Sequence, residues 1–321
     1  MAATSDVIPI NLNISPPPMS FQEHNTEPSD EKIGKTRQEP PSFSPQVGPP
    51  RGVLQASEDR GGAFFHRRIA SPEELSPWLQ HFWFVQWDLR GMPPSHAETL
   101  PHPNGYLFFE HDLLEPSEDP TVAQRAEVSG VTTGKFSRAM EGHGRVFGLK
   151  FTPGGLRPFL QNSASTLTDR IVPARNIFGE DILTLASELR HLDSAEAMAE
   201  AAALYFQERL PRRDADAEHC TALVDMIFKD STLLTVEALS ERTALSVRTL
   251  QRLFKEYVGI SPKWVIRRYR LHDLLERLHA EQTFDGARIA ADLGYADQAH
   301  LINDFRKLSG FTPTEYRKRS K

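Results

Sequence analysis

Two stretches of the sequence share one pattern at a spacing of 51 residues. Residues 250–262 read LQRLFKEYVGISP, and residues 301–313 read LINDFRKLSGFTP. The positions that coincide are Leu250 with Leu301, Phe254 with Phe305, Lys255 with Arg306, Gly259 with Gly310, Ser261 with Thr312 and Pro262 with Pro313. Apolar residues at helical spacing, a glycine that ends a helix and a proline that begins the next predict a duplicated helical unit.

Each copy has the features of a helix-turn-helix. In the first copy, Thr235 is placed to cap a short helix, residues 243–245 form a tight turn, and Ser246 caps the second helix. In the second copy, Gly294 lies at the turn and Asp297 caps the second helix. The second helix of such a unit is the one that enters the major groove of DNA.

The face opposite the apolar stripe of each second helix carries the candidate DNA-reading side chains. Arginine can pair with guanine through two hydrogen bonds and glutamine with adenine, whereas Ala299 and Ile302 can only contact a thymine methyl group. We therefore expect the first unit to read sequence more strongly. The predicted contacts are Ser246, Arg248, Thr249, Gln251, Arg252, Gln298, His300 and Asn303.

A long helix is predicted between the two units. Ser261 and Pro262 begin it and it runs to about Leu278, so it spans roughly 25 Å at 1.5 Å per residue. That length can hold two recognition helices near one turn of DNA, about 34 Å, apart. Arg267 and Arg268 are then candidates for phosphate contacts, although a solvated helix face explains such arginines equally well.

The charge distribution supports a polyanionic partner for the C-terminal part only. The whole chain has a net charge of −6, but residues 221–321 hold 17 Lys and Arg against 13 Asp and Glu, a net charge of +4. The remaining residues carry −10. A basic domain on an acidic body is typical of a chain in which one domain binds nucleic acid.

Residues 223–319 resemble the DNA-binding domain of AraC/XylS-type bacterial transcription regulators. The matching motifs are LQRLFK at 250–255, VGISP at 258–262, IAADLGYADQAHL at 289–301, FRK at 305–307 and GFTPTEY at 310–316. The resemblance implies double-stranded DNA and RNA polymerase as partners and transcription regulation, not catalysis, as the function. Asn303 departs from the arginine that members often carry, which weakens the expectation for the second unit.

Upstream of the helical region the sequence predicts an all-β domain. Short aromatic and β-branched runs, such as residues 81–87, 106–109 and 145–151, alternate with turn signals. Residues 181–192 and 194–210 predict an αα-hairpin that closes this domain or pairs with another subunit. HPNG at 102–105 and FGLKFTPGG at 147–155 resemble the cupin-like N-terminal domain of one branch of these regulators, which implies a small-molecule effector or a homodimer.

The predicted fold class is therefore multidomain α+β. Residues 1–60 form a proline-rich disordered arm, residues 61–213 a β-rich cupin-like barrel domain with C-terminal helices, and residues 214–321 an all-α double helix-turn-helix domain. Phe82, Phe84, Trp87 and Phe108 are candidates for an effector pocket, with core packing of the sheet as the simpler interpretation.

The sequence favours no cofactor and no metal. Cys220 is the only cysteine, so neither a disulfide nor a thiolate metal site is expected, and the cytoplasm is the expected compartment. No run of residues is apolar enough to span a membrane. A cupin-type metalloenzyme is the competing interpretation, but the histidines at 81, 96, 102, 111 and 143 lack a His-x-His spacing. A third interpretation is a helical protein-interaction module, for which no salt-dependent affinity for DNA is expected.

Overall fold

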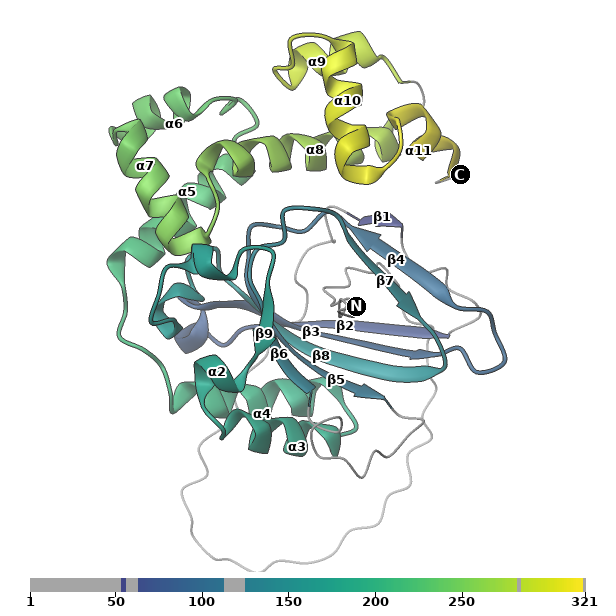
Figure 1. Cartoon of the computed structure of the whole chain (residues 1–321), viewed down its shortest axis with the longest axis vertical. Coiled ribbons are helices and arrows are strands. Elements are labelled where there is room, and N and C mark those ends of the chain that lie inside the picture. The colour runs from purple at the N-terminus through teal and green to yellow at the C-terminus, as the bar shows by residue number, and fades with distance from the viewer. Residues whose placement is uncertain (1–52, 56–62, 113–124, 282–283, 320–321) are drawn as a thin grey trace, which may run out of the picture.

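The chain forms two domains, a β-rich domain and a helical domain that lies along one end of it (Figure 1). The computed structural model describes residues 53–55, 63–112, 125–281 and 284–319. Most of the predicted N-terminal arm lies outside the described residues. Val53–Gln55, at its end, form strand β1 and pair with β4, so this part of the arm belongs to the folded domain and corrects the predicted boundary.

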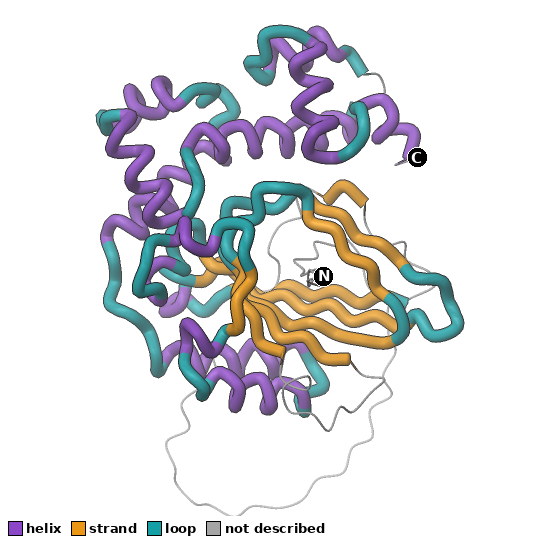
Figure 2. The backbone as a smooth tube through the Cα atoms, in the orientation of Figure 1, coloured by secondary structure: helices purple, strands orange, loops and turns teal. Residues whose placement is uncertain are grey.

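Two antiparallel sheets face each other in the β-rich domain (Figure 2). The larger sheet has the order β2-β3-β8-β5-β6-β9, and the smaller has the order β1-β4-β7. The strands are β2 (Phe64–Ala70), β3 (Leu79–Asp88), β4 (Ser95–Thr99), β5 (Tyr106–Asp112), β6 (Arg125–Ser129), β7 (Phe136–Met140), β8 (His143–Phe151) and β9 (Ile171–Pro173). Short 3-10 turns η1 (Glu73–Leu75), η2 (Arg157–Phe159) and η3 (Ala164–Leu167) connect them.

The larger sheet has an apolar core on each face because successive side chains of a strand point to opposite sides. Phe82 and Phe84 of β3 pack with Phe147 of β8 against helices α3 (Ile182–Arg190) and α4 (Ala195–Gln207). The predicted αα-hairpin thus closes the β-rich domain. On the opposite face, side chains of β3, β5 and β8 pack against the smaller sheet; this core includes Trp83, Val85, Trp87, Phe108, Phe136 and Met140.

The helical domain contains the predicted repeat. Its helices are α5 (Ala215–Lys229), α6 (Val236–Thr243), α7 (Val247–Leu253), the π-helical turn η4 (Phe254–Val258), α8 (Pro262–Ala280), α9 (Gly286–Asp292), α10 (Gln298–Ser309) and α11 (Pro313–Arg319). A further short helix, α2 (Arg175–Phe178), precedes α3. The predicted fold class is confirmed: a β-rich domain with an αα-hairpin precedes an all-α domain of two helix-turn-helix units. No helix among the described residues combines the length and apolar character needed to cross a membrane.

Close packing between strands explains one glycine of the larger sheet. Gly148 of β8 lies opposite Trp83 of β3, and a Cβ atom at position 148 would lie 2.3 Å from the Trp83 ring. A side chain at this position would push the indole into the core between the sheets, and overpacking of a dense core is destabilising.

We expect Gly148→Ala to lower the free energy of unfolding by about 1–3 kcal/mol, because the alanine methyl group would overlap the Trp83 ring. Gly134→Ala is the matched control, since no atom lies within 4 Å of its added Cβ. Denaturant unfolding of both variants measures the difference. Equal stabilities of the two variants would contradict this account of the sheet.

Candidate nucleic-acid interface

Side-chain caps fix the first turn of both recognition helices. In α7, the Ser246 hydroxyl accepts a hydrogen bond from the Thr249 amide at 3.1 Å. In α10, the Asp297 carboxylate accepts one from the His300 amide at 2.7 Å. These caps are the predicted ones, and they satisfy amide groups that a helix N-terminus otherwise leaves without partners.

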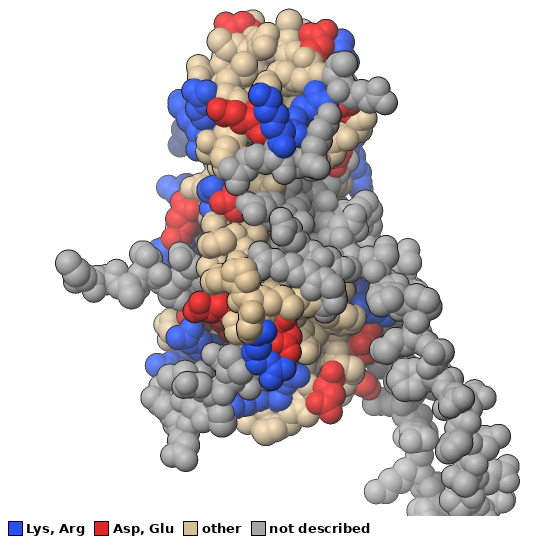
Figure 3. Space-filling model, turned by 90° about the vertical axis from the view of Figure 1, so that its right-hand side faces the viewer, with Lys and Arg blue, Asp and Glu red and all other residues tan. Residues whose placement is uncertain are grey.

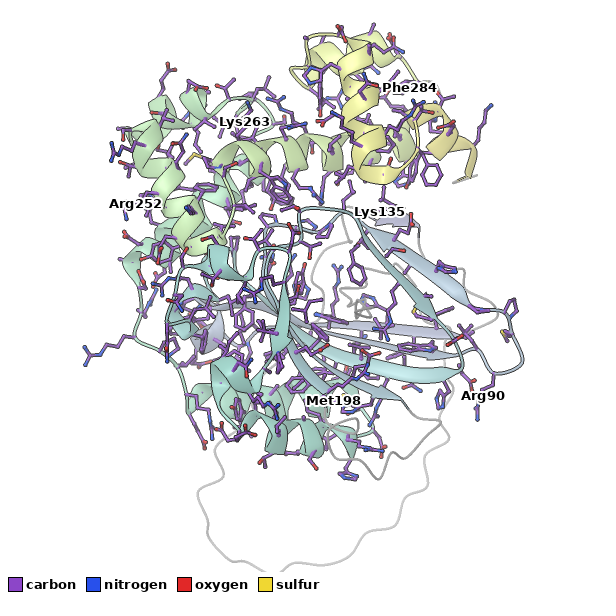
Figure 4. All side chains as sticks on the ribbon, viewed as in Figure 1. Arg90, Lys135, Met198, Arg252, Lys263 and Phe284 are labelled. Atoms are coloured by element: carbon purple, nitrogen blue, oxygen red, sulfur yellow. The ribbon has the colours of Figure 1, made fainter. Side chains whose placement is uncertain are left out.

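Both recognition helices expose the predicted face. Arg248, Gln251 and Arg252 of α7 are exposed, whereas Leu250 and Leu253 are buried in the first unit. Arg252 lies on the outer side of α7, away from the body of the chain (Figure 4). Thr249 is half-buried, and the Ser246 hydroxyl is close to the Thr249 hydroxyl at 2.9 Å.

The second recognition helix exposes a face of different chemistry. Gln298, His300 and Asn303 are exposed on α10, with Leu301 and Phe305 buried beneath them. The His300 ring meets the Tyr295 ring edge-on at 5.2 Å between centroids. This face presents amide and imidazole groups, whereas α7 presents two guanidinium groups. The structure thus places the predicted base-reading residues on accessible surfaces, and their contacts with DNA remain a prediction.

The two recognition helices contact the β-rich domain near their C-terminal ends. After α7 and η4, the carbonyl of Gly259 accepts a hydrogen bond from the Thr168 hydroxyl at 2.7 Å. At the end of α10, the carbonyl of Ser309 lies 3.5 Å from the Lys135 ammonium, which also pairs with Glu98. The N-terminal turns of α7 and α10 therefore lie away from the β-rich domain (Figures 1 and 4).

Arg268 is not a phosphate contact in this structure, which corrects the prediction from sequence. Its side chain is 2% exposed and lies between the domains. The guanidinium group donates hydrogen bonds to the carbonyls of Thr133 and Pro101, and it lies 4.3 Å from the Trp264 ring centroid. Burial lowers the pKa of Arg268 to about 9. Arg268 therefore holds helix α8 on the β-rich domain.

Arg267, the other predicted phosphate contact on α8, is engaged with the second unit. Its guanidinium group pairs with the buried carboxylate of Asp304 on α10. The same carboxylate accepts a hydrogen bond from the Tyr295 hydroxyl at 2.9 Å. The Arg267 side chain is still 49% exposed, so it can face a ligand while it positions α10. This role of Asp304 was not predicted from the sequence.

A third arginine of α8 contacts both units. Arg270 donates to the carbonyl of Leu234, and a second nitrogen lies 3.5 Å from the carbonyl of Gly294. Leu234 directly precedes the cap of α6, and Gly294 is the left-handed residue between α9 and α10. Arg270 thus fixes the two units relative to each other through one guanidinium group.

The face of the molecule that carries the second unit is not uniformly basic. Lysine and arginine side chains gather there beside acidic ones, with other residues between them (Figure 3). A surface of mixed sign attracts a polyanion less strongly at long range than a continuous basic surface does.

The four residues predicted to line an effector pocket do not share one cavity, because strand alternation separates them. Phe82 and Phe84 are core residues on the helix-covered face of the larger sheet, and Phe108 is buried on the other face. Trp87 alone lines a cavity of about 620 Å³, at the end of β3 and β8 that also holds Arg90 and Met140. A second cavity, of about 230 Å³, lies between the domains and includes Lys150 and Tyr269.

The histidines of the β-rich domain are dispersed. His81, His102 and His111 are buried, whereas His96 is exposed and His143 is half-buried. Burial lowers the pKa of His111 to about 4, so this side chain is neutral at physiological pH. Within the described part of the chain, no three His, Cys, Asp or Glu side chains are grouped to hold a metal ion.

Family models match both domains. Residues 239–319 match a helix-turn-helix domain family. Residues 67–173 match a family described as a domain of unknown function, DUF6597. The first match runs from Leu239, within α6, to the end of α11 and so includes nearly all of both helix-turn-helix units.

The curated relatives are transcription regulators. RhaS of Escherichia fergusonii, an HTH-type transcriptional activator, is 30% identical over 141 residues, which cover 43% of this chain and 48% of that protein. An AraC-like transcription regulator of Streptomyces lividans is 33% identical over 104 residues, 32% of this chain and 34% of that protein. The chain thus spans about half the length, or less, of these relatives.

Solved structures align with one or both domains. Apo ToxT of Vibrio cholerae, as a point variant, aligns over 74% of this chain and 97% of that chain, with a TM-score of 0.37 and 14% identity. The C-terminal domain of the response regulator yesN of Fusobacterium nucleatum aligns over 32% of this chain and 99% of that chain, with a TM-score of 0.28 and 26% identity.

We expect Arg268→Ala to loosen the contact between the domains. The substitution removes charge-assisted hydrogen bonds to two carbonyls, each worth about 1.5–3 kcal/mol. Hydrogen exchange should become faster in α8 and around Thr133, while the cores of α7 and α10 keep their protection. Arg267→Ala is the control, because Arg267 bonds only within the helical domain among the described residues. Unchanged exchange at Thr133 in Arg268→Ala would show that Arg268 does not hold the domains together.

Proposed function

We propose, from the premise that this chain is a transcription regulator of the AraC/XylS type, that its helical domain binds double-stranded DNA with both units. The observation that carries this proposal is the pair of capped helices, α7 and α10, each with an exposed polar face. Helix α8 joins the units with 19 residues, about 28 Å of helix. Such an arrangement suits two successive segments of the major groove.

We assign unequal roles to the two units. Arg248, Gln251 and Arg252 of α7 can form paired hydrogen bonds with guanine or adenine, so α7 reads sequence. Gln298, His300 and Asn303 of α10 make fewer or weaker contacts, and the first turns of both helices approach phosphates with their amide groups. Arg267 contacts the backbone of the DNA from α8, next to Asp304.

The β-rich domain controls DNA binding, either through a small-molecule effector or through a homodimer. The β-rich domain contacts the first unit through Thr168 and the second unit through Lys135. A conformational change in either domain can therefore be transmitted to the other. An effector has two cavities available, and Leu204 of α4, which is 53% exposed, offers an apolar contact to a second copy. The chain activates transcription, by analogy with RhaS, which is named a transcriptional activator. RNA polymerase is the partner that the resemblance to AraC/XylS-type regulators implies.

The first test is the salt dependence of binding. The full chain should bind a duplex selected from random sequence, and each phosphate contact should contribute a slope of about −0.9 to the logarithm of affinity against the logarithm of salt concentration. Fluorescence anisotropy between 50 and 300 mM salt, roughly the physiological range, measures this slope. Affinity that does not change with salt would indicate a protein-interaction module.

The second test compares the two units. Arg252→Ala should weaken binding to the selected duplex by about 5- to 150-fold, the range for one lost bidentate base contact of 1–3 kcal/mol, and more than Asn303→Ala does. Arg175→Ala, an exposed arginine of the β-rich domain, should have no effect and serves as the control. Asn303→Arg should strengthen binding to DNA at low salt but should hardly increase the preference for the selected duplex over a scrambled one. If Asn303→Ala were the more damaging change, Asn303 would be a reader of adenine and α7 would not dominate.

A further inference from the structure

Lys150 is a buried lysine of β8. It lies at the end of β8 nearest the helical domain, opposite His81 of β3 and Tyr106 of β5. Its side chain is 6% exposed. Among the described residues, none forms a hydrogen bond or an ion pair with its amine. Because a buried charge is costly unless it is paired, this position needs a functional explanation.

The amine of Lys150 faces a cavity that both domains line. The cavity has a volume of about 230 Å³, space for several water molecules at about 30 Å³ each. The β-rich domain and helices α5 and α8 contribute its walls, which are Gln80, His102, Asn104, Lys150, Pro153, Asp225, Phe228, Lys229 and Tyr269. A small molecule in this cavity would therefore contact both domains at once.

The surroundings favour the uncharged amine. Burial, and to a smaller extent the positive charge of Arg68, lower the pKa of Lys150 to about 7, and Asp225 opposes this shift. Burial also holds the pKa of His81 well below its usual value. The titratable and charged groups that face Lys150 are Arg68, His81, His102, Tyr106, Asp225, Lys229 and Tyr269. A neutral amine is a nucleophile toward carbonyl carbon.

We propose that Lys150 holds a small aldehyde or ketone effector as a reversible imine in the cavity between the domains. This inference rests on the proposed control of DNA binding by the β-rich domain. The amine nitrogen forms a bond to the carbonyl carbon, and the carbonyl oxygen becomes a hydroxyl group. One amine proton passes to the oxygen when the hydroxyl group forms. The hydroxyl group then takes up a second proton and leaves as water, and the nitrogen loses its remaining proton as the C=N bond of the imine forms. Hydrolysis reverses each step, and no oxidant or reductant is needed.

An adduct on Lys150 would lie beside side chains of the helical domain and could change the position of its helices. Phe228 of α5 and Tyr269 of α8 line the same cavity, and Tyr269 lies next to Arg268 in the sequence. The Tyr269 ring also packs against Phe228, with centroids 5.1 Å apart. An imine on Lys150 would occupy space beside these rings and change how α5 and α8 rest on the β-rich domain.

The experiment traps the imine on the full chain. The protein is incubated with propanal and cyanoborohydride at pH 7, and peptide mass spectrometry measures alkylation at Lys150 and at the exposed Lys263. We expect Lys150 to react about tenfold faster or more, because a larger fraction of it is the free amine. Between pH 7 and pH 9 its rate should rise only about twofold, whereas a lysine with the ordinary pKa of about 10.4 gains about a hundredfold.

Two variants control the assignment. Lys150→Arg should lose the fast reaction and keep DNA binding, since Lys150 is not part of the DNA-binding surface. Lys263→Arg should leave the reaction of Lys150 unchanged. Alkylation of Lys150 no faster than that of Lys263, with DNA binding intact, would overturn the imine and leave the proposed function standing. Protection of Lys150 from propanal by phosphate would overturn it as well, in favour of an anion site. Fast reaction of Lys150 in a chain that fails to bind DNA would overturn the proposed function instead.

Discussion

The burial of one guanidinium group organises the contact between the two domains. Arg268 lies between the Trp264 ring on its own helix and the carbonyl groups of Pro101 and Thr133 on the β-rich domain. An arginine removed from water is tolerated only while its donors remain paired, so α8 cannot leave the β-rich domain without a large cost in free energy. Because α8 also joins both helix-turn-helix units, its docking fixes where both recognition helices point.

The arginines of α8 show how one helix serves three partners. Positions 267, 268 and 270 point in different directions because each residue advances by about 100° around the helix. Arg267 reaches α10 through Asp304, Arg268 reaches the β-rich domain, and Arg270 reaches Leu234 before α6 and Gly294 in the turn of the second unit. The relative position of the two units thus depends on three arginines that, from the sequence alone, would be taken for a single basic patch.

Most elements of the helical domain could be predicted from the sequence, but far fewer elements of the β-rich domain could be. Caps such as Ser246 and Asp297 and the stripe of Leu250 and Phe254 act locally, so their pattern predicts helix positions well. The smaller sheet was missed because β4 and β7 have only five residues each and their buried positions include Ser95, Thr99 and Arg138, so neither strand shows an alternation of apolar with polar residues. The role of Arg268 was in principle predictable, since it lies four residues after Trp264 and three before Leu271, on the buried stripe of α8. Its carbonyl partners, however, lie more than 130 residues away along the chain.

The proposed DNA contacts and the contacts with the β-rich domain lie at different ends of the helix-turn-helix units. The proposed base-reading side chains lie on α7 and α10, whereas Gly259, which follows η4, and Ser309, at the end of α10, contact the β-rich domain. Helix α10 has 12 residues, about 18 Å of helix, so a tilt of about 10° at its docked end moves its first turn by about 3 Å. Hydrogen bonds to bases are lost over displacements of about 0.5 Å. In the proposed control of DNA binding, a molecule in the cavity at Lys150 would act through such a tilt, without any rearrangement within the helix-turn-helix units.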